Sequence, residues 1–189
     1  VGIFAVFAIT FSFSTLLPTV LLGPPYKLPE SLSFTIGLLL NLGSAVAPLV
    51  AILTLDRWGR KLTGIVFSGL GIIVFLIWGL LTPRTNLSLF LVLAFLAGLT
   101  YDAAPASLFL LSGELYPTRI RGAAEGHNMA WGRIAGILMP LVAGSILSIF
   151  TDRYYFFVYA AILSAIAAIT FPFLPETRRK LLEKITGHS

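Results

Sequence analysis

Apolar residues occur along the chain in six long runs, which short polar stretches separate. A helix needs about 20 apolar residues to cross a bilayer, and each run is close to that length. The period-two alternation of a membrane β-barrel is absent. Because lipid offers the backbone no hydrogen-bonding partner, helices are the structure that remains. The pattern predicts an all-α membrane protein with six transmembrane helices, at Val1–Leu22, Leu32–Leu55, Thr63–Leu81, Leu87–Leu111, Met129–Phe150 and Tyr154–Leu174.

The composition agrees with this pattern. Hydrophobic residues make up 57% of the chain and charged residues 11%, and the mean hydropathy is +0.94. Soluble domains contain about 45–50% apolar and about 25% charged residues. The net charge of +5 comes from short clusters between the apolar runs, without a basic face that carries interleaved aromatics. We therefore expect a lipid bilayer as a partner and no nucleic acid.

Several kinds of chemistry are excluded by the residues themselves. The chain has no cysteine, which excludes thiol catalysis, disulfides and cysteine-ligated metals. Its two histidines lack metal-ligand spacing, and no glycine-rich loop ends in Gly-Lys-Ser or Gly-Lys-Thr. No nucleophile–base pair lies at one membrane depth. We expect no metal, no cofactor and no enzymatic activity.

The distribution of basic residues predicts the orientation in the membrane. Three of them, Lys27, Arg84 and Arg153, lie on one side of the predicted helices. Nine lie on the other side, which we expect to be cytoplasmic: Arg57, Arg60, Lys61, Arg119, Arg121, Arg178, Arg179, Lys180 and Lys184. Both ends of the chain then lie in the cytoplasm, beneath a plasma or inner membrane. Since the chain begins inside an apolar run without a methionine, we expect it to be the C-terminal part of a longer protein.

Acidic residues accompany the arginines in all three cytoplasmic segments. The segments are Asp56–Lys61, Gly113–Gly122 and Pro175–Arg179. We expect Gly113–Gly122 to form a water-facing hinge between two spanning helices, and Gly59 to permit a tight reversal. Lys and Arg alone would be enough to anchor the helices, so the repeated acids predict salt bridges between the segments.

Three motifs in these segments resemble the cytoplasmic signatures of the major facilitator superfamily. They are Asp56-Arg57-x-Gly59-Arg60-Lys61, Glu114-x-x-Pro117-Thr118-x-x-Arg121 and Pro175-Glu176-Thr177. Their order and spacing are similar to the second half of such a transporter and cover essentially the whole chain. The resemblance implies that residues 1–189 form the C-terminal six-helix half, equivalent to helices 7–12, that the N-terminal half is missing, and that transport proceeds by alternating access.

The resemblance also assigns roles to individual residues. In that family the cytoplasmic motifs form a charge network that stabilises the outward-open state. Here the network would comprise Asp56, Arg57, Gly59, Arg60, Glu114, Pro117, Arg119, Arg121, Glu176 and Arg178. The chain departs from the family pattern at Ile52, where a glycine is usual, and at Phe11–Thr15, where sugar porters carry a glutamine pair. Trp131–Ile134 is more similar to the organic-ion branch, which includes aromatic-acid, nicotinate and organic-cation carriers.

Two ionisable residues lie within the predicted spans. Asp102 precedes Glu114 by 12 residues, or about 18 Å, which places it near the midplane of a bilayer with a half-thickness of about 15 Å. It shares a helical row with Ala94, Gly98 and Ala106, so we expect it to face the protein interior. An intramembrane carboxylate is a functional candidate by default. Arg133 lies at a similar depth, and it either pairs with Asp102 or snorkels to the cytoplasmic interface.

Further polar and aromatic side chains are candidates for contact with a small solute: Tyr101, Asn41, Asn128 and Trp131. A fixed Arg133 favours an anionic substrate, and a titratable Asp102 would carry a proton. The sequence therefore predicts secondary active transport of a small organic solute, as proton-coupled symport of an organic anion. The alternatives are an organic cation, a drug or a sugar as substrate, and a receptor-like membrane protein without transport.

Overall fold

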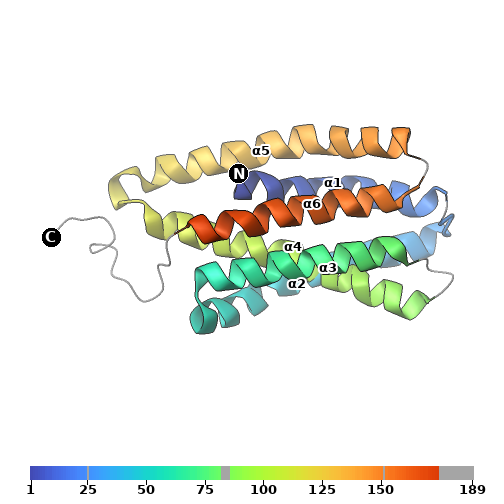
Figure 1. Ribbon diagram of the computed structural model, residues 1–189, viewed down its shortest axis with the longest axis horizontal. Coiled ribbons are helices and arrows are strands. Elements are labelled where there is room, and N and C mark those ends of the chain that lie inside the picture. Colours follow the sequence, from blue (N-terminus) through green and yellow to red (C-terminus); the bar gives the residue numbers. More distant parts are fainter. Residues whose placement is uncertain (25, 82–85, 151, 175–189) are drawn as a thin grey trace.

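The structure is a computed structural model that describes residues 1–24, 26–81, 86–150 and 152–174, with residues 112–114 described by their backbone only. Within these residues it forms six α-helices and one 3-10 turn (Figure 1). All six helices are long and apolar enough to cross a membrane, so the predicted fold class is confirmed. They are α1 (Gly2–Leu22), α2 (Glu30–Trp58), α3 (Arg60–Leu80), α4 (Leu87–Leu115), α5 (Thr118–Ile149) and α6 (Tyr154–Thr170), followed by η1 (Phe171–Phe173).

The connection between α4 and α5 is shorter than the sequence predicted. Since α4 continues to Leu115 and α5 begins at Thr118, only Tyr116 and Pro117 lie between the helices. A residue before proline is excluded from the helical region, and Tyr116 accordingly has φ −103° and ψ 136°. The predicted hinge over Gly113–Gly122 was therefore wrong in its extent, because most of that stretch is helical.

Helices α2, α4 and α5 also extend beyond their apolar runs. The start of α5 lies eleven residues before Met129, the predicted start of that span. Hydropathy marks the part of a helix that suits lipid, whereas nothing in the polar stretch after Pro117 breaks the helix. At the end of α6, Pro172 lies within the 3-10 turn that ends the helical segment. Gly59 alone separates α2 from α3, with a φ of 91° that favours glycine.

The helices pack in pairs that are distant in sequence. Helix α1 packs chiefly against α5, α2 against α4 and α3 against both α4 and α6. In Figure 1, α5 lies at one edge of the bundle and α2 at the other, with α1, α6 and α4 between them. Large aromatic side chains fill the core near the ends of α1 and α3. The ring centroid of Phe13 lies 5.0 Å from that of Phe75 and 4.6 Å from that of Phe156.

Two glycines bring the backbones of α2 and α4 into contact. A Cβ atom built on Gly98 would lie 2.9 Å from the carbonyl carbon of Leu40 and 3.0 Å from the amide nitrogen of Ser44. A Cβ atom on Gly43 would likewise meet the backbone of Phe95 and Leu99 on α4. Such close packing of small residues is a usual way for helices to associate in membranes. It fixes the height at which the polar side chains of the two helices meet.

Candidate functional site

The centre of the candidate site is a carboxylate–hydroxyl pair between α2 and α4. Ser44 donates a hydrogen bond to Asp102 Oδ2. Ser44 lies fourteen residues from either end of α2. Asp102 lies fifteen residues after the first residue of α4 and thirteen before its last. The half-buried Asp102 therefore meets its partner midway along both helices. The sequence predicted that its helical row faces the protein interior, and Gly98 of this row packs against the backbone of α2.

Tyr101 adds a third polar group to this pair. Its side chain is buried, with 4% of its surface exposed. The phenol interacts electrostatically with Asp102 and approaches the hydroxyl of Ser44. The structure thus brings two predicted site residues, Tyr101 and Asp102, together around a serine that the sequence analysis did not identify.

A groove between α1 and α2 lies on the outer side of this cluster. It has a volume of about 360 Å³ and is lined by Phe13, Ser14 and Leu17 of α1 and by Phe34, Gly37 and Asn41 of α2, among others. Asn41 is exposed and its Nδ2 donates to the carbonyl of Gly37 at 2.8 Å. Its amide oxygen makes no hydrogen bond within the described residues. Asn41 precedes Ser44 by one helical turn, so the groove leads toward Asp102.

Arg133 lies apart from this cluster. It is fifteen residues from the start of α5 and sixteen from its end, so it occupies the middle of its helix, as Asp102 does. The side chain is exposed and makes no ion pair or hydrogen bond with any residue that the structure describes. Helix α5 lies at the opposite edge of the bundle from α2, the helix that carries Ser44 (Figure 1). The two charges thus lie at similar heights on their helices without forming the pair that was one of the two alternatives.

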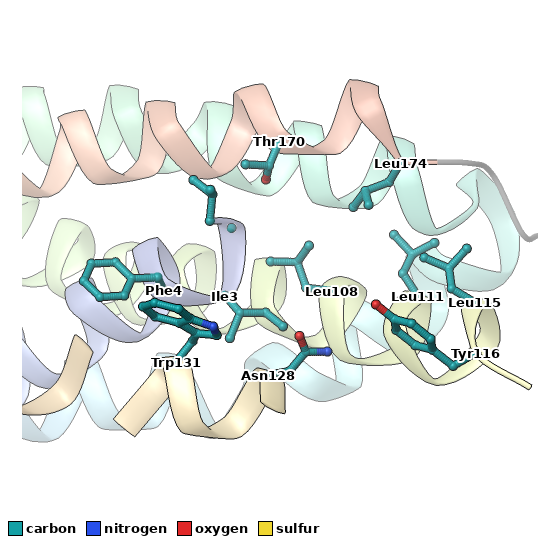
Figure 2. Close-up of a pocket in the computed structure, with 12 residues that line it drawn as sticks. Ile3, Phe4, Leu108, Leu111, Leu115, Tyr116, Asn128, Trp131, Thr170 and Leu174 are labelled. Atoms are coloured by element: carbon teal, nitrogen blue, oxygen red, sulfur yellow. The ribbon is translucent and has the colours of Figure 1, made fainter. Parts of the chain in front are cut away.

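Asn128 and Trp131 line a different cavity, which lies near the predicted cytoplasmic end of the bundle (Figure 2). It has a volume of about 230 Å³. Figure 2 shows both side chains on α5, facing residues of α1 and α4 that include Ile3 and Leu108. The indole Nε1 of Trp131 donates to His127 Nε2 at 2.9 Å, which fixes the orientation of the ring. The six predicted solute-binding residues are therefore divided among four places.

The predicted charge network is only partly within the described side chains. Lys61 Nζ donates to the carbonyl of Pro172 at 2.6 Å and so joins the α2–α3 connection to η1. Two further contacts are local: Arg60 Nη1 donates to the Leu55 carbonyl and Arg121 Nε to that of Tyr116, both at 3.4 Å. The side chain of Glu114, and all of Glu176 and Arg178, lie outside the described residues. The salt bridges between segments stay a prediction.

Ser44 could have been found from the sequence. Gly37, Asn41, Ser44 and Pro48 recur at intervals of four, three and four residues, which places them on one face of α2. A polar or small residue at each of these positions marks the side of the helix that does not face lipid. Asn41 is thus one member of a polar stripe that also contains Ser44.

Comparison with known proteins identifies the family. A family model described as sugar (and other) transporter matches residues 5–188. The chain belongs to this family. Its fold is that of the major facilitator superfamily: the solved structure of the proton:xylose symporter XylE, bound to 6-bromo-6-deoxy-D-glucose, matches with a TM-score of 0.74 at 16% identity, over 98% of this chain and 46% of that one. Proteins of this family and fold are transporters rather than enzymes.

Curated relatives include transporters of aromatic acids. The gentisate transporter of Corynebacterium glutamicum is 28% identical over 83% of this chain and 35% of its own length. The benzoate transport protein of Acinetobacter baylyi is 25% identical over 94% of this chain and 37% of its own length. Proteins named as transporters of phosphate, organic cations and galactose match as well. The chain thus spans about a third of the length of the curated relatives it matches, and these relatives differ in substrate.

Proposed function

We propose that the chain is the C-terminal half of a secondary active transporter, in which Asp102 carries the proton that drives uptake of a small organic anion. The observation that supports this most directly is the hydrogen bond between Ser44 and Asp102 midway along α2 and α4. A carboxylate at this depth costs about 2.5–3.5 kcal/mol on insertion scales, so a site that retains one needs it for a purpose.

The partner of Asp102 suits a group that gains and loses a proton. A serine hydroxyl donates a hydrogen bond to a carboxylate and accepts one from a carboxylic acid. Ser44 therefore serves Asp102 in both protonation states without moving to a new position. An arginine or lysine partner would instead have held the carboxylate in its charged form.

The groove between α1 and α2 is the proposed position of the solute. Its volume of about 360 Å³ lies within the range of small-molecule sites, about 300–1,000 Å³. Asn41 offers a free amide oxygen at the rim, and Phe13 and Phe34 offer aromatic surface for a planar ring. Gentisate and benzoate, which are named for two relatives, combine such a ring with a carboxylate.

The surfaces of α2 and α5 support a second half. Only 28% of the span of α2 and 17% of that of α5 is buried within this bundle, against 44–50% for the other four helices. These two helices form opposite edges of the bundle (Figure 1). We propose that they contact an N-terminal six-helix half, and that Arg133 on α5 then contributes positive charge to the cavity between the halves. A cytoplasmic location of both chain ends forms part of this proposal.

The test is uptake of labelled benzoate by proteoliposomes that contain the complete transporter. We expect Asp102→Asn to abolish accumulation driven by a pH gradient and to preserve exchange of labelled for unlabelled benzoate, because exchange needs no net proton movement. Glu30→Gln, which removes an exposed carboxylate at the start of α2, is the matched control and should accumulate normally. Full accumulation by the Asp102 variant would contradict the proton-coupling role.

One observation favours a second candidate, an organic cation as substrate. Because Arg133 does not pair with Asp102, the carboxylate lacks a basic partner among the described residues and is available to attract a cation. The variant Arg133→Gln separates the two candidates. An anion carrier should lose most benzoate uptake in this variant, whereas a cation carrier should retain uptake of a quaternary ammonium probe.

A further inference from the structure

A second polar site lies in the interior of the bundle, away from the groove, and shares Tyr101 with the cluster around Asp102. It is a small cavity between α1, α3, α4 and α6, and every residue that lines it is buried. Besides Tyr101, two serines and one threonine contribute hydroxyls to its wall, one from each of three helices: Ser68 of α3, Thr100 of α4 and Ser164 of α6. Their exposed fractions are only 3–4%.

These hydroxyls have hydrogen-bonding capacity that the protein leaves unused. Ser68 Oγ is fully buried and has no hydrogen-bond partner in the part of the chain that the structure describes. Ser164 Oγ also makes no hydrogen bond with any described residue. Thr100 Oγ1 donates to the carbonyl of Ala97 at 3.0 Å and keeps its lone pairs free to accept. A buried polar group without a partner costs about 1–3 kcal/mol. The unpartnered Ser68 Oγ, with two further hydroxyls beside the same cavity, therefore indicates a ligand that bonds to all three.

The cavity is the size of one water molecule. Its volume of about 10 Å³ is close to the roughly 10–15 Å³ that a single water occupies by this measure. Gly71 keeps the space open, because a Cβ atom there would lie 3.2 Å from Ser164 Oγ and 3.7 Å from Thr100 Oγ1. The described wall contains no carboxylate, which a bound metal cation would require to offset its charge.

We propose that this cavity holds one ordered water molecule that bridges Ser68, Thr100 and Ser164. The water accepts a hydrogen bond from one serine hydroxyl and donates hydrogen bonds to the other two hydroxyls. Ser68 Oγ thereby gains a hydrogen-bond partner. It connects α3 and α6 to the turn of α4 that carries Tyr101, which also lines the cavity. The bridging water thereby links α4, which carries Asp102, to α3 and α6.

The sign of a stability change tests the proposal. If the water is present, Ser68→Ala removes a satisfied hydrogen bond and should lower the apparent Tm in detergent by about 2–4 °C. Ser107→Ala is the matched control, because Ser107 Oγ is buried without a partner and does not line this cavity. Removing that hydroxyl should leave the apparent Tm unchanged or raise it. An unchanged or raised Tm for the Ser68 variant as well would overturn the proposal.

A double-mutant cycle tests whether the two serines bond to the same water. Either single substitution breaks the bridge, so the Ser68→Ala, Ser164→Ala double variant should lose about 2 °C less than the sum of the two single variants. Additive losses would contradict a shared water. Repeating the melts in sodium and in choline chloride tests for a cation, and a sodium-dependent Tm that the Ser68 substitution abolishes would show that the ligand is an ion and not water.

Discussion

Replacing Gly98 by alanine would place a methyl group in the contact between α2 and α4. The new Cβ would lie 2.9 Å from the carbonyl carbon of Leu40 and 3.0 Å from the amide nitrogen of Ser44. Both atoms belong to the backbone of a helix, so no side chain can move aside. The two helices must separate, and the hydrogen bond between Ser44 and Asp102 lengthens or breaks.

The size of the effect follows from two opposing terms. Alanine is favoured over glycine within a helix by about 1 kcal/mol. Overpacking a close contact costs about 1–3 kcal/mol, and a backbone obstacle places this case at or above the upper end. The net loss is therefore about 2 kcal/mol, which corresponds to a fall of about 4–8 °C in the apparent Tm.

The assay is thermal unfolding in detergent, followed by benzoate uptake in proteoliposomes. Gly69→Ala is the control, because a Cβ atom on Gly69 meets nothing within 4 Å; this variant should keep or raise the apparent Tm. We expect the Gly98 variant to lose accumulation together with stability. A Gly98 variant as stable as the control would refute the close backbone contact.

Two further predictions concern the end of the bundle that carries the α1–α2 connection. Burial, together with the negative charge of Asp152, raises the pKa of Tyr26 to about 12 from its usual 10.0. Between these values the folded state keeps a proton that the unfolded state has lost, so stability should fall from pH 10 to 12, and Tyr26→Phe should flatten this part of the Tm–pH curve. Arg153 Nε donates to the Pro24 carbonyl at 2.8 Å and so connects the start of α6 to the α1–α2 loop. Arg153→Ala should therefore speed proteolysis of this loop relative to the control Lys27→Ala. Equal rates of proteolysis in the two variants would show that the Arg153 hydrogen bond does not stabilise the loop.

The sequence was sufficient to predict the six spans and the heights of the ionisable residues. Lipid imposes a length of about 20 apolar residues on each span, and the rise of a helix is fixed at about 1.5 Å per residue. Counting residues therefore placed Asp102 and Arg133 near the middle of their helices. The direction in which a side chain points was predictable only where a row of small residues marked the face, as it did for Asp102.

The neighbours of each helix were not predictable in the same way. Whether Arg133 meets Asp102 depends on which helices lie between α4 and α5, and the order of the helices in the sequence does not determine this. The extent of α5 was also missed, because the polar residues after Pro117 form a helix without being hydrophobic. Ser44 was not predicted as a site residue because single serines are common in membrane helices and only its spacing from Asn41 distinguishes it.

The pairing of α1 with α5 has a consequence for how the protein is made. The 95 residues between the end of α1 at Leu22 and the start of α5 at Thr118 take several seconds to synthesise at about 5–20 residues per second, so α1 is made well before its principal partner. During that interval α1 must remain in the bilayer without its partner, and it carries no charged residue that would make this costly. Helix α5, with Arg133 at its middle, arrives last but one and finds α1 already in place. Because of the order of the helices along the chain, α1, the more apolar helix of the pair, is therefore inserted before α5, which carries Arg133.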